Sequence, residues 1–243
     1  MSGLLKEGLL QLMHDDPDID KLCGSRFDAI QELLEKYVCE IELFNEAYGL
    51  VSVQSHDELI VKHILDSLAP LGILFRILSA ASRDSIKAAD IGSGAGLPGI
   101  PLAIAMPGIF FDLVEKMGRR AGFLKNSLAL LALPNAGIIE KEMEKLEAEQ
   151  FDLIICRAFK PLSADLIKKF SRLLRAGGSM AFYKGRLEKT AGEIRESGIG
   201  NTCRLVKISV PFLDEERHVL VWNKLMKQSF VYNAVRQQTP KVE

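Results

Sequence analysis

The stretch Ala89-Asp-Ile-Gly-Ser-Gly-Ala-Gly-Leu-Pro-Gly-Ile-Pro101 decides the fold of this chain. The apolar residues before it predict a strand, and the residues after it predict a helix that begins near Gly99. Four glycines crowd the turn between the two, and glycine allows positive φ and a close approach of the backbone to a ligand. A plain turn is the alternative. A glycine-rich turn from strand to helix is instead typical of ligand sites in open α/β sheets.

Short apolar runs alternate with helical stretches from residue 85 onward. The expected strands are Ile86–Ile91, Phe110–Glu115, Ala136–Ile139, Leu153–Cys156, Met180–Tyr183, Leu205–Val210 and His218–Trp222. The expected helices cover about 99–106, 118–131, 162–174 and 187–197. This alternation predicts an α/β fold with a mostly parallel sheet and helices on both faces. The last two strands follow each other without a helix, which predicts an antiparallel hairpin at one edge of the sheet.

The residues before 85 have a helical pattern. Apolar residues recur at steps of three and four along two runs, which lie within 27–44 and 59–68. We therefore expect a helical N-terminal region over 1–84, an α/β domain over 85–225 and a C-terminal tail over 226–243.

Composition narrows the class of protein and its partners. The 243 residues are 48% hydrophobic and 26% charged, which excludes disordered and fibrous chains. Lys and Arg number 31 and Asp and Glu number 32, so nucleic acid would have to bind a local basic patch. The four cysteines are far apart, which predicts free thiols in a reducing compartment and no metal site. No apolar run approaches 20 residues, so we expect a cytoplasmic protein without a membrane span.

Two cofactors fit the glycine turn. Gly94-x-Gly96-x-x-Gly99, followed about twenty residues later by Glu115, matches the dinucleotide pattern and leaves an NAD-dependent oxidoreductase open. However, Asp90 ends the first strand, and its carboxylate would add like charge near a pyrophosphate. The same carboxylate suits S-adenosylmethionine, which carries an amino group and a sulfonium. Glu115 can accept hydrogen bonds from ribose hydroxyls in either case.

Further motifs occur in order along the chain. They are Phe44–Leu50, His63–Leu68, Gly118–Leu124, Phe151–Phe159, Tyr183–Gly185 and Asp214–His218. With the glycine turn they resemble the RsmG family, also called glucose-inhibited division protein B, over roughly residues 40–222. The resemblance implies a class I, Rossmann-like methyltransferase with a seven-stranded sheet. It also implies transfer of a methyl group from S-adenosylmethionine to N7 of a guanine in bacterial small-subunit (16S) ribosomal RNA.

The resemblance implies roles for particular residues. The backbone of the turn, with Asp90, Gly92, Gly94 and Leu97, would grip the cofactor. Further along the chain, Glu115, Met143 and Glu144 would hold its ribose and adenine. Arg157 would lie at the opening of the cofactor and substrate site. No catalytic acid or base is expected, because guanine N7 has a free lone pair and alignment can supply much of the rate enhancement.

The chain departs from the family pattern in three places. Gly49-Leu-Val51 stands where the family usually has Asn-Leu-Thr, and Glu142 and Lys145 replace an Arg and a Glu that are common after the third strand. Cys156 stands where Ser is common. Pyrimidine C5 methyltransferases place a nucleophilic cysteine near this position, so Cys156 is either a nucleophile or, as is commoner, a buried thiol.

The expected RNA contacts are Arg119, Arg120, Lys184, Arg217 and His218, supported by Lys116, Lys125, Lys160 and Arg186. Ordinary solvated surface is the alternative for these cations, and a polar residue at a strand edge is the alternative for His218. Phe159 either stacks on a base or packs in the core. The expected partner is small-subunit ribosomal RNA or a ribosomal subunit, bound by a monomer. A methyltransferase of the same class with another substrate, and a non-catalytic RNA-binding module, remain open.

Overall fold

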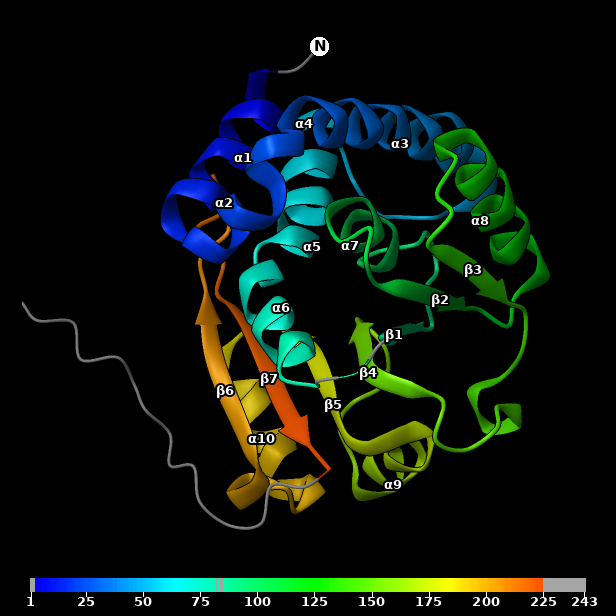
Figure 1. Cartoon of the computed structure of the whole chain (residues 1–243), viewed down its shortest axis with the longest axis vertical. Helices are drawn as coiled ribbons and strands as arrows, with labels where there is room; N and C mark the ends of the chain where they lie inside the picture. The colour runs from blue at the N-terminus through cyan, green and yellow to red at the C-terminus, as the bar shows by residue number, and fades with distance from the viewer. Residues whose placement is uncertain (1–2, 82, 84, 225–243) are drawn as a thin grey trace, which may run out of the picture.

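A computed structural model describes residues 3–81, 83 and 85–224, and its centre is a seven-stranded sheet (Figure 1). The strands run in the order β3-β2-β1-β4-β5-β7-β6. Their bounds are β1 (Lys87–Ile91), β2 (Phe110–Val114), β3 (Ala136–Ile139), β4 (Phe151–Arg157), β5 (Leu174–Lys184), β6 (Cys203–Ile208) and β7 (Arg217–Asn223). The first five strands are parallel, and β7 is antiparallel to both β5 and β6. The predicted terminal hairpin is confirmed, with β6 at the edge of the sheet.

Helices cover both faces of the sheet, as expected. Before β1 they are α1 (Gly3–Asp15), α2 (Pro17–Cys23), η1 (Gly24–Arg26), α3 (Phe27–Tyr48), α4 (His56–Leu59), η2 (Ile60–Leu65), α5 (Asp66–Leu68) and α6 (Leu71–Ser79). After β1 they are α7 (Gly99–Ala105), α8 (Gly118–Leu131), η3 (Met143–Lys145), α9 (Ala164–Leu173), α10 (Leu187–Ser197) and η4 (Gly200–Thr202). The segment η2 is a π-helical turn, and η1, η3 and η4 are short 3₁₀ turns.

The alternation of side chains along each strand divides the core into two layers. In β4, Leu153 and Ile155 join the layer under α1–α8, whereas Ile154 and Cys156 join the layer under α9 and α10. Figure 1 shows the same division, with the N-terminal helices, α7 and α8 on one side of the sheet. The N-terminal helices therefore share one hydrophobic core with the sheet. The expected C-terminal tail lies outside the described residues.

The order of the strands fixes where a ligand can bind. The chain leaves β1 toward β2 and β3 on one side, and returns to β4 and β5 on the other. At such a reversal the connections that follow the two central strands diverge and leave a crevice beyond their carboxyl ends. Here the crevice lies between the turn after β1 and the segment after β4.

Candidate functional site

The glycine turn between β1 and α7 has the backbone that its sequence predicts. Gly92, Gly94 and Gly96 have φ values of 73°, 60° and 87°, which disfavour any residue with a Cβ. A residue from another element also stabilises the turn: the buried Tyr37 hydroxyl of α3 donates a hydrogen bond to the Ala95 carbonyl.

The backbone amides of the turn are not a row of free donors, contrary to expectation. The amides of Gly92 and Ser93 donate to the Val114 carbonyl at 2.9 and 3.1 Å, and the Gly94 amide donates to Glu115 Oε2 at 3.0 Å. Since these amides already donate to protein acceptors, they are not available to a ligand. The turn instead contributes a backbone without side chains, which a ligand can approach closely.

Asp90 lies under the turn and is only 1% exposed. Its Oδ2 accepts hydrogen bonds from Ser93 Oγ at 2.8 Å and from the Gly99 amide at 2.9 Å. Its Oδ1 is buried and has no partner within the part of the chain that the structure describes. Burial raises the pKa of Asp90 to about 6, despite the opposing effect of these two hydrogen bonds. An unpartnered carboxylate oxygen in such surroundings favours a nearby cation.

A cavity of about 420 Å³, here called the glycine-turn cavity, opens beside the turn. It is bounded by the ends of β1 and β2 and by the segments after β3 and β4. Its lining includes Gly92, Glu115, Arg120, Met143, Glu144 and Phe159. Glu115 is buried at the end of β2, where Oε1 accepts from the Met117 amide at 2.9 Å. Each carboxylate oxygen can accept a second hydrogen bond, so Glu115 can also bind ligand hydroxyls.

The segment after β3 is positioned by an arginine that sequence reasoning missed. Arg172 of α9 donates to the Leu146 carbonyl at 2.8 Å and to the Glu144 carbonyl at 3.3 Å. Met143 is buried in this segment, whereas Glu144 is exposed and pairs with Lys169 at 3.4 Å. Met143 and Glu144 therefore both reach the glycine-turn cavity, as expected.

Four residues expected at the cofactor, Asp90, Gly94, Leu97 and Arg157, do not line the glycine-turn cavity. Asp90 and Gly94 lie under and within the turn, whereas the other two point away from it. Leu97 is buried in the core, because the turn directs it toward the helices and away from the glycine-turn cavity. Arg157 points toward the N-terminal helices, where Nη1 contacts Asp66 Oδ2 at 3.0 Å and Nη2 contacts His63 Nδ1 at 3.2 Å. Leu97 and Arg157 therefore pack behind the residues that line the cavity.

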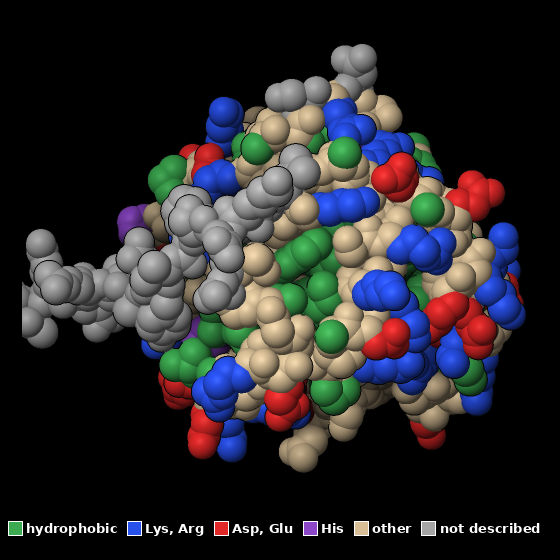
Figure 2. Space-filling model, turned by 90° about the horizontal axis from the view of Figure 1, so that it is seen from below, with side chains coloured by type: hydrophobic (Ala, Val, Ile, Leu, Met, Phe, Trp, Pro, Cys, Tyr) green, Lys and Arg blue, Asp and Glu red, His purple; other side chains and the backbone are tan. Residues whose placement is uncertain are grey.

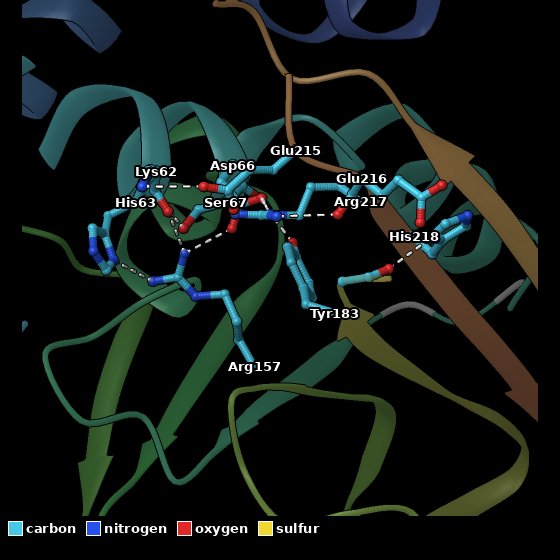
Figure 3. Close-up of polar contacts among 11 residues, drawn as sticks. Lys62, His63, Asp66, Ser67, Arg157, Tyr183, Glu215, Glu216, Arg217 and His218 are labelled. Atoms are coloured by element: carbon cyan, nitrogen blue, oxygen red, sulfur yellow. Dashed lines mark hydrogen bonds and ion pairs between the residues drawn. The ribbon is translucent and has the colours of Figure 1, made fainter. Parts of the chain in front are cut away.

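Asp66 is the centre of a buried polar cluster that joins α5 to the ends of three strands (Figure 3). Its Oδ1 accepts from Arg217 Nε at 2.9 Å, and its Oδ2 accepts from Arg157. The Tyr183 hydroxyl donates to the Ser67 carbonyl at 2.8 Å beside it. Burial lowers the pKa of His63 to about 4, and the Arg157 charge acts in the same direction, so His63 is neutral at pH 7.

Three of the expected RNA contacts are occupied within the protein. Arg217 pairs with Asp66, and Lys184 Nζ pairs with Glu193 Oε2 at 2.5 Å. His218 is 6% exposed, and its Nδ1 lies 2.7 Å from the Gly185 carbonyl, because β7 lies between β5 and β6. This burial favours a structural role for His218 over contact with a substrate.

The remaining expected contacts are exposed at the start of α8. Arg120 lines the glycine-turn cavity, whereas Arg119 is drawn toward α3. Its guanidinium donates to the Ala47 carbonyl and lies 4.6 Å from the centroid of the Tyr48 ring. Lys and Arg side chains alternate with Asp and Glu over the face in Figure 2, which agrees with the balanced charge of the chain.

Cys156 is a buried thiol in the layer under α9. Desolvation raises its pKa well above the usual value for a thiol, so it is protonated at neutral pH. A protonated, apolar-packed thiol is a poor nucleophile, which favours the structural interpretation over the catalytic one.

Phe159 packs against the core and also lines the glycine-turn cavity. Its ring packs so closely on Gly92 that a Cβ there would lie 2.6 Å from a ring carbon. The ring also lies 6.1 Å from that of Phe170, while its other surface faces the glycine-turn cavity.

Sequence reasoning also missed Tyr37, His63 and Asp66. Tyr37 belongs to a helical apolar stripe that predicts burial but not the hydrogen bond. His63 and Asp66 lie in the motif His63–Leu68, and an acid inside the apolar run Leu59–Leu68 is a further signal, but neither observation predicts their contacts. Within the described residues, no group of three His, Cys, Asp or Glu side chains could hold a metal ion, and no helix is long and apolar enough to span a membrane.

Comparison with known proteins gives consistent matches over the whole site. The family model GidB, rRNA small subunit methyltransferase G, matches residues 30–220. A ribosomal RNA small subunit methyltransferase G from Treponema denticola is 33% identical and covers 92% of this chain and 94% of that protein. The protein of the same name from Treponema pallidum is 37% identical, with 90% and 92% covered.

Solved structures support the fold. A predicted O-methyltransferase from Agrobacterium tumefaciens matches with a TM-score of 0.50 and 22% identity, and covers 64% of this chain and 83% of that chain. A tRNA methyltransferase from Aquifex aeolicus matches with a TM-score of 0.50 and 14% identity, with 65% and 70% covered. These neighbours place the sheet and its surrounding helices in the class I methyltransferase fold.

Proposed function

This chain belongs to the rRNA small subunit methyltransferase G family, and from that premise we propose that it methylates N7 of a guanine in small-subunit ribosomal RNA. It is an S-adenosylmethionine-dependent methyltransferase. The observation that carries the proposal is the family match across residues 30–220, which includes every element that bounds the glycine-turn cavity.

The residues of the glycine-turn cavity fit S-adenosylmethionine. When bound, this cofactor supplies an electrophilic methyl group on a sulfonium. Asp90 Oδ1, buried and unpartnered, would favour the cationic end of the cofactor. Glu115 would accept hydrogen bonds from its ribose hydroxyls, and Met143 would pack on its adenine. Gly92 keeps the floor of the cavity free of a side chain.

The same cavity supports a mechanism without an acid or a base. Its titratable lining residues are Glu, Lys and Arg side chains, to which we assign binding and not proton transfer. Guanine N7 has a lone pair at neutral pH, so the protein needs only to align the two reactants and exclude water. Alignment of this kind can contribute roughly 7–11 kcal/mol to the barrier reduction.

The RNA would bind through the exposed cations around the cavity. Lys116, Arg120 and Lys160 line it and are exposed, so they can reach phosphates. Arg217 and His218, which pair inside the protein, would instead hold the site together. We assign cofactor binding to residues 85–225 and the support of the cavity to 1–84, in a monomer that acts in the cytoplasm.

The experiment is methyl transfer to RNA from cells that lack this gene. Small-subunit RNA, alone and in assembled subunits, is incubated with tritiated S-adenosylmethionine, and the labelled nucleoside is identified. The proposal predicts one labelled 7-methylguanosine per RNA. Label in another nucleoside would overturn the N7 assignment. RNA binding without any label would indicate a non-catalytic binding module.

A further inference from the structure

A second cavity lies beside the glycine-turn cavity, at the same edge of the sheet. We call it the α10 cavity; its volume is about 420 Å³. Its lining comes from the segment after β4, the end of β5 and the first turns of α10, and includes Phe159, Tyr183, Lys184, Arg186, Lys189 and Glu193. Ala158, Phe159 and Lys160 line both cavities, so a single chain segment separates them. The α10 cavity therefore lies where an acceptor would be next to the methyl donor.

The most informative feature of this cavity is an ion pair that is largely shielded from solvent. Lys184 Nζ lies 2.5 Å from Glu193 Oε2, and the two side chains are 13% and 12% exposed. The Leu162 amide donates to the same Oε2 at 3.0 Å. Within the described residues, Glu193 Oε1 accepts no hydrogen bond, so it has full capacity for a donor that enters the cavity.

Glu193 is ionised at neutral pH. Burial by itself would raise the pKa of this carboxyl, but the hydrogen bonds from Lys184 and Leu162 and the charge of Lys189 outweigh burial and lower it. The cavity thus presents a fixed carboxylate acceptor directly beside a fixed ammonium donor.

We propose that the α10 cavity binds the target guanine and that Glu193 and Lys184 read its Watson–Crick edge. This inference rests on the proposed function and adds the residues that select the base. Guanine presents two adjacent donors, N1–H and the N2 amino group, next to the acceptor O6. A carboxylate beside an ammonium matches that order, with Glu193 accepting from the two donors and Lys184 donating to O6.

This arrangement explains how N7 stays free for the reaction. Gripping the Watson–Crick edge leaves the opposite side of the purine, which carries N7, without a protein partner. Glu193 and Lys184 belong to α10 and β5, whereas the segment that separates the cavities follows β4. The N7 side of a base held by them therefore faces the glycine-turn cavity.

The same pair rejects adenine. Adenine presents an amino group where guanine has O6 and an unprotonated N1 where guanine has N1–H. Lys184 would face a donor and Glu193 an acceptor, so neither group could hydrogen-bond to that edge and both contacts would be repulsive. Phe159 offers an aromatic face for stacking to any base, and the exposed Arg186 and Lys189 can contact its phosphate.

The test compares three mononucleotides on the whole protein saturated with S-adenosylhomocysteine, so that only the acceptor site is free. Binding of GMP, IMP and AMP is measured by saturation-transfer NMR titration. IMP differs from GMP only in lacking the N2 amino group, and the lost hydrogen bond to a carboxylate should weaken binding about tenfold or more. AMP should bind more weakly still.

Glu193→Gln is the variant that isolates the carboxylate. The amide oxygen can still accept from Leu162, but the charge is lost, so the preference for GMP over IMP should fall to within about twofold. Glu196→Gln, an exposed glutamate on the same helix, removes the same charge outside the cavity and should keep the preference. Calorimetric binding of S-adenosylhomocysteine to both variants checks that they are folded.

Three results would each overturn the inference. They are no binding of GMP, equal binding of GMP and IMP to the unmodified protein, and a GMP preference that survives in folded Glu193→Gln. The proposed function fails separately, through absence of methyl transfer to small-subunit RNA. A protein that methylates RNA but shows no GMP preference would keep its function and lose this assignment.

Discussion

At the scale of single residues, Asp90 links cofactor affinity to pH. Burial raises its pKa to about 6, so the carboxyl loses its charge as the pH falls through that value. S-adenosylhomocysteine retains a cationic amino group, and its affinity should fall by up to about tenfold per pH unit below 6. We expect calorimetric dissociation constants from pH 5 to 8 to follow this course. In Asp90→Asn the affinity should be weaker at pH 7.5 and nearly independent of pH.

The raised pKa of Asp90 also makes the stability of the folded protein depend on pH. Its pKa in the folded protein lies above that of the unfolded chain, so the folded state binds its proton more tightly. The Asp90 contribution is therefore most favourable below about pH 4 and is lost as the pH rises through 6. We compare the unfolding free energy of Asp90→Asn with that of the unmodified protein at each pH. The difference, variant minus unmodified, should rise by up to about 3 kcal/mol from pH 4 to pH 7.5. A difference that does not change with pH would contradict the raised pKa.

Cys156 gives a second prediction at this scale. Because its thiol is buried and protonated, Cys156→Ala should retain methyl transfer within a few-fold. The loss of one sulfur atom from the core should lower the unfolding free energy by about 1–2 kcal/mol. Tritium incorporation and urea unfolding measure the two effects. Loss of all transfer in a stably folded variant would restore the nucleophile hypothesis.

At the scale of elements, Asp66 fastens the N-terminal helices to the sheet. Its carboxylate pairs with Arg157 from β4 and Arg217 from β7, and its side chain is 8% exposed. Asp66→Asn removes the carboxylate that both half-buried guanidinium groups share, and only Arg217 keeps another acidic partner, Glu215. The change should cost about 3–5 kcal/mol of unfolding free energy. Urea denaturation measures this cost. Asp214→Asn, an exposed aspartate in the loop before β7, should change the unfolding free energy by less than about 0.5 kcal/mol.

The elements themselves were largely predictable from the sequence. Period-two apolar runs and glycine turns are local signals, and they place α8 at 118–131 and β3 at 136–139 as observed. Pairings between distant residues were not predictable. Arg157 and Asp66 are 91 residues apart, and their contact depends on where α5 and β4 meet in three dimensions. The burial of His218 was not predictable for the same reason, since it depends on the position of β7 inside the sheet.

At the scale of the whole molecule, the central claim is that the cavity beside the glycine turn holds S-adenosylmethionine. The reversal of strand order creates the crevice, and Asp90 and Glu115 give it acidic groups at two strand ends. The Asp90 carboxylate would add like charge near a pyrophosphate, whereas Glu115 suits the ribose of either cofactor. The competing NAD site is therefore the sharpest alternative to test.

Calorimetric titration at pH 7.5 makes this comparison directly. S-adenosylhomocysteine should bind at one site per chain, whereas NAD should give no saturable heat. Saturable binding of NAD together with no heat from S-adenosylhomocysteine or S-adenosylmethionine would contradict the account.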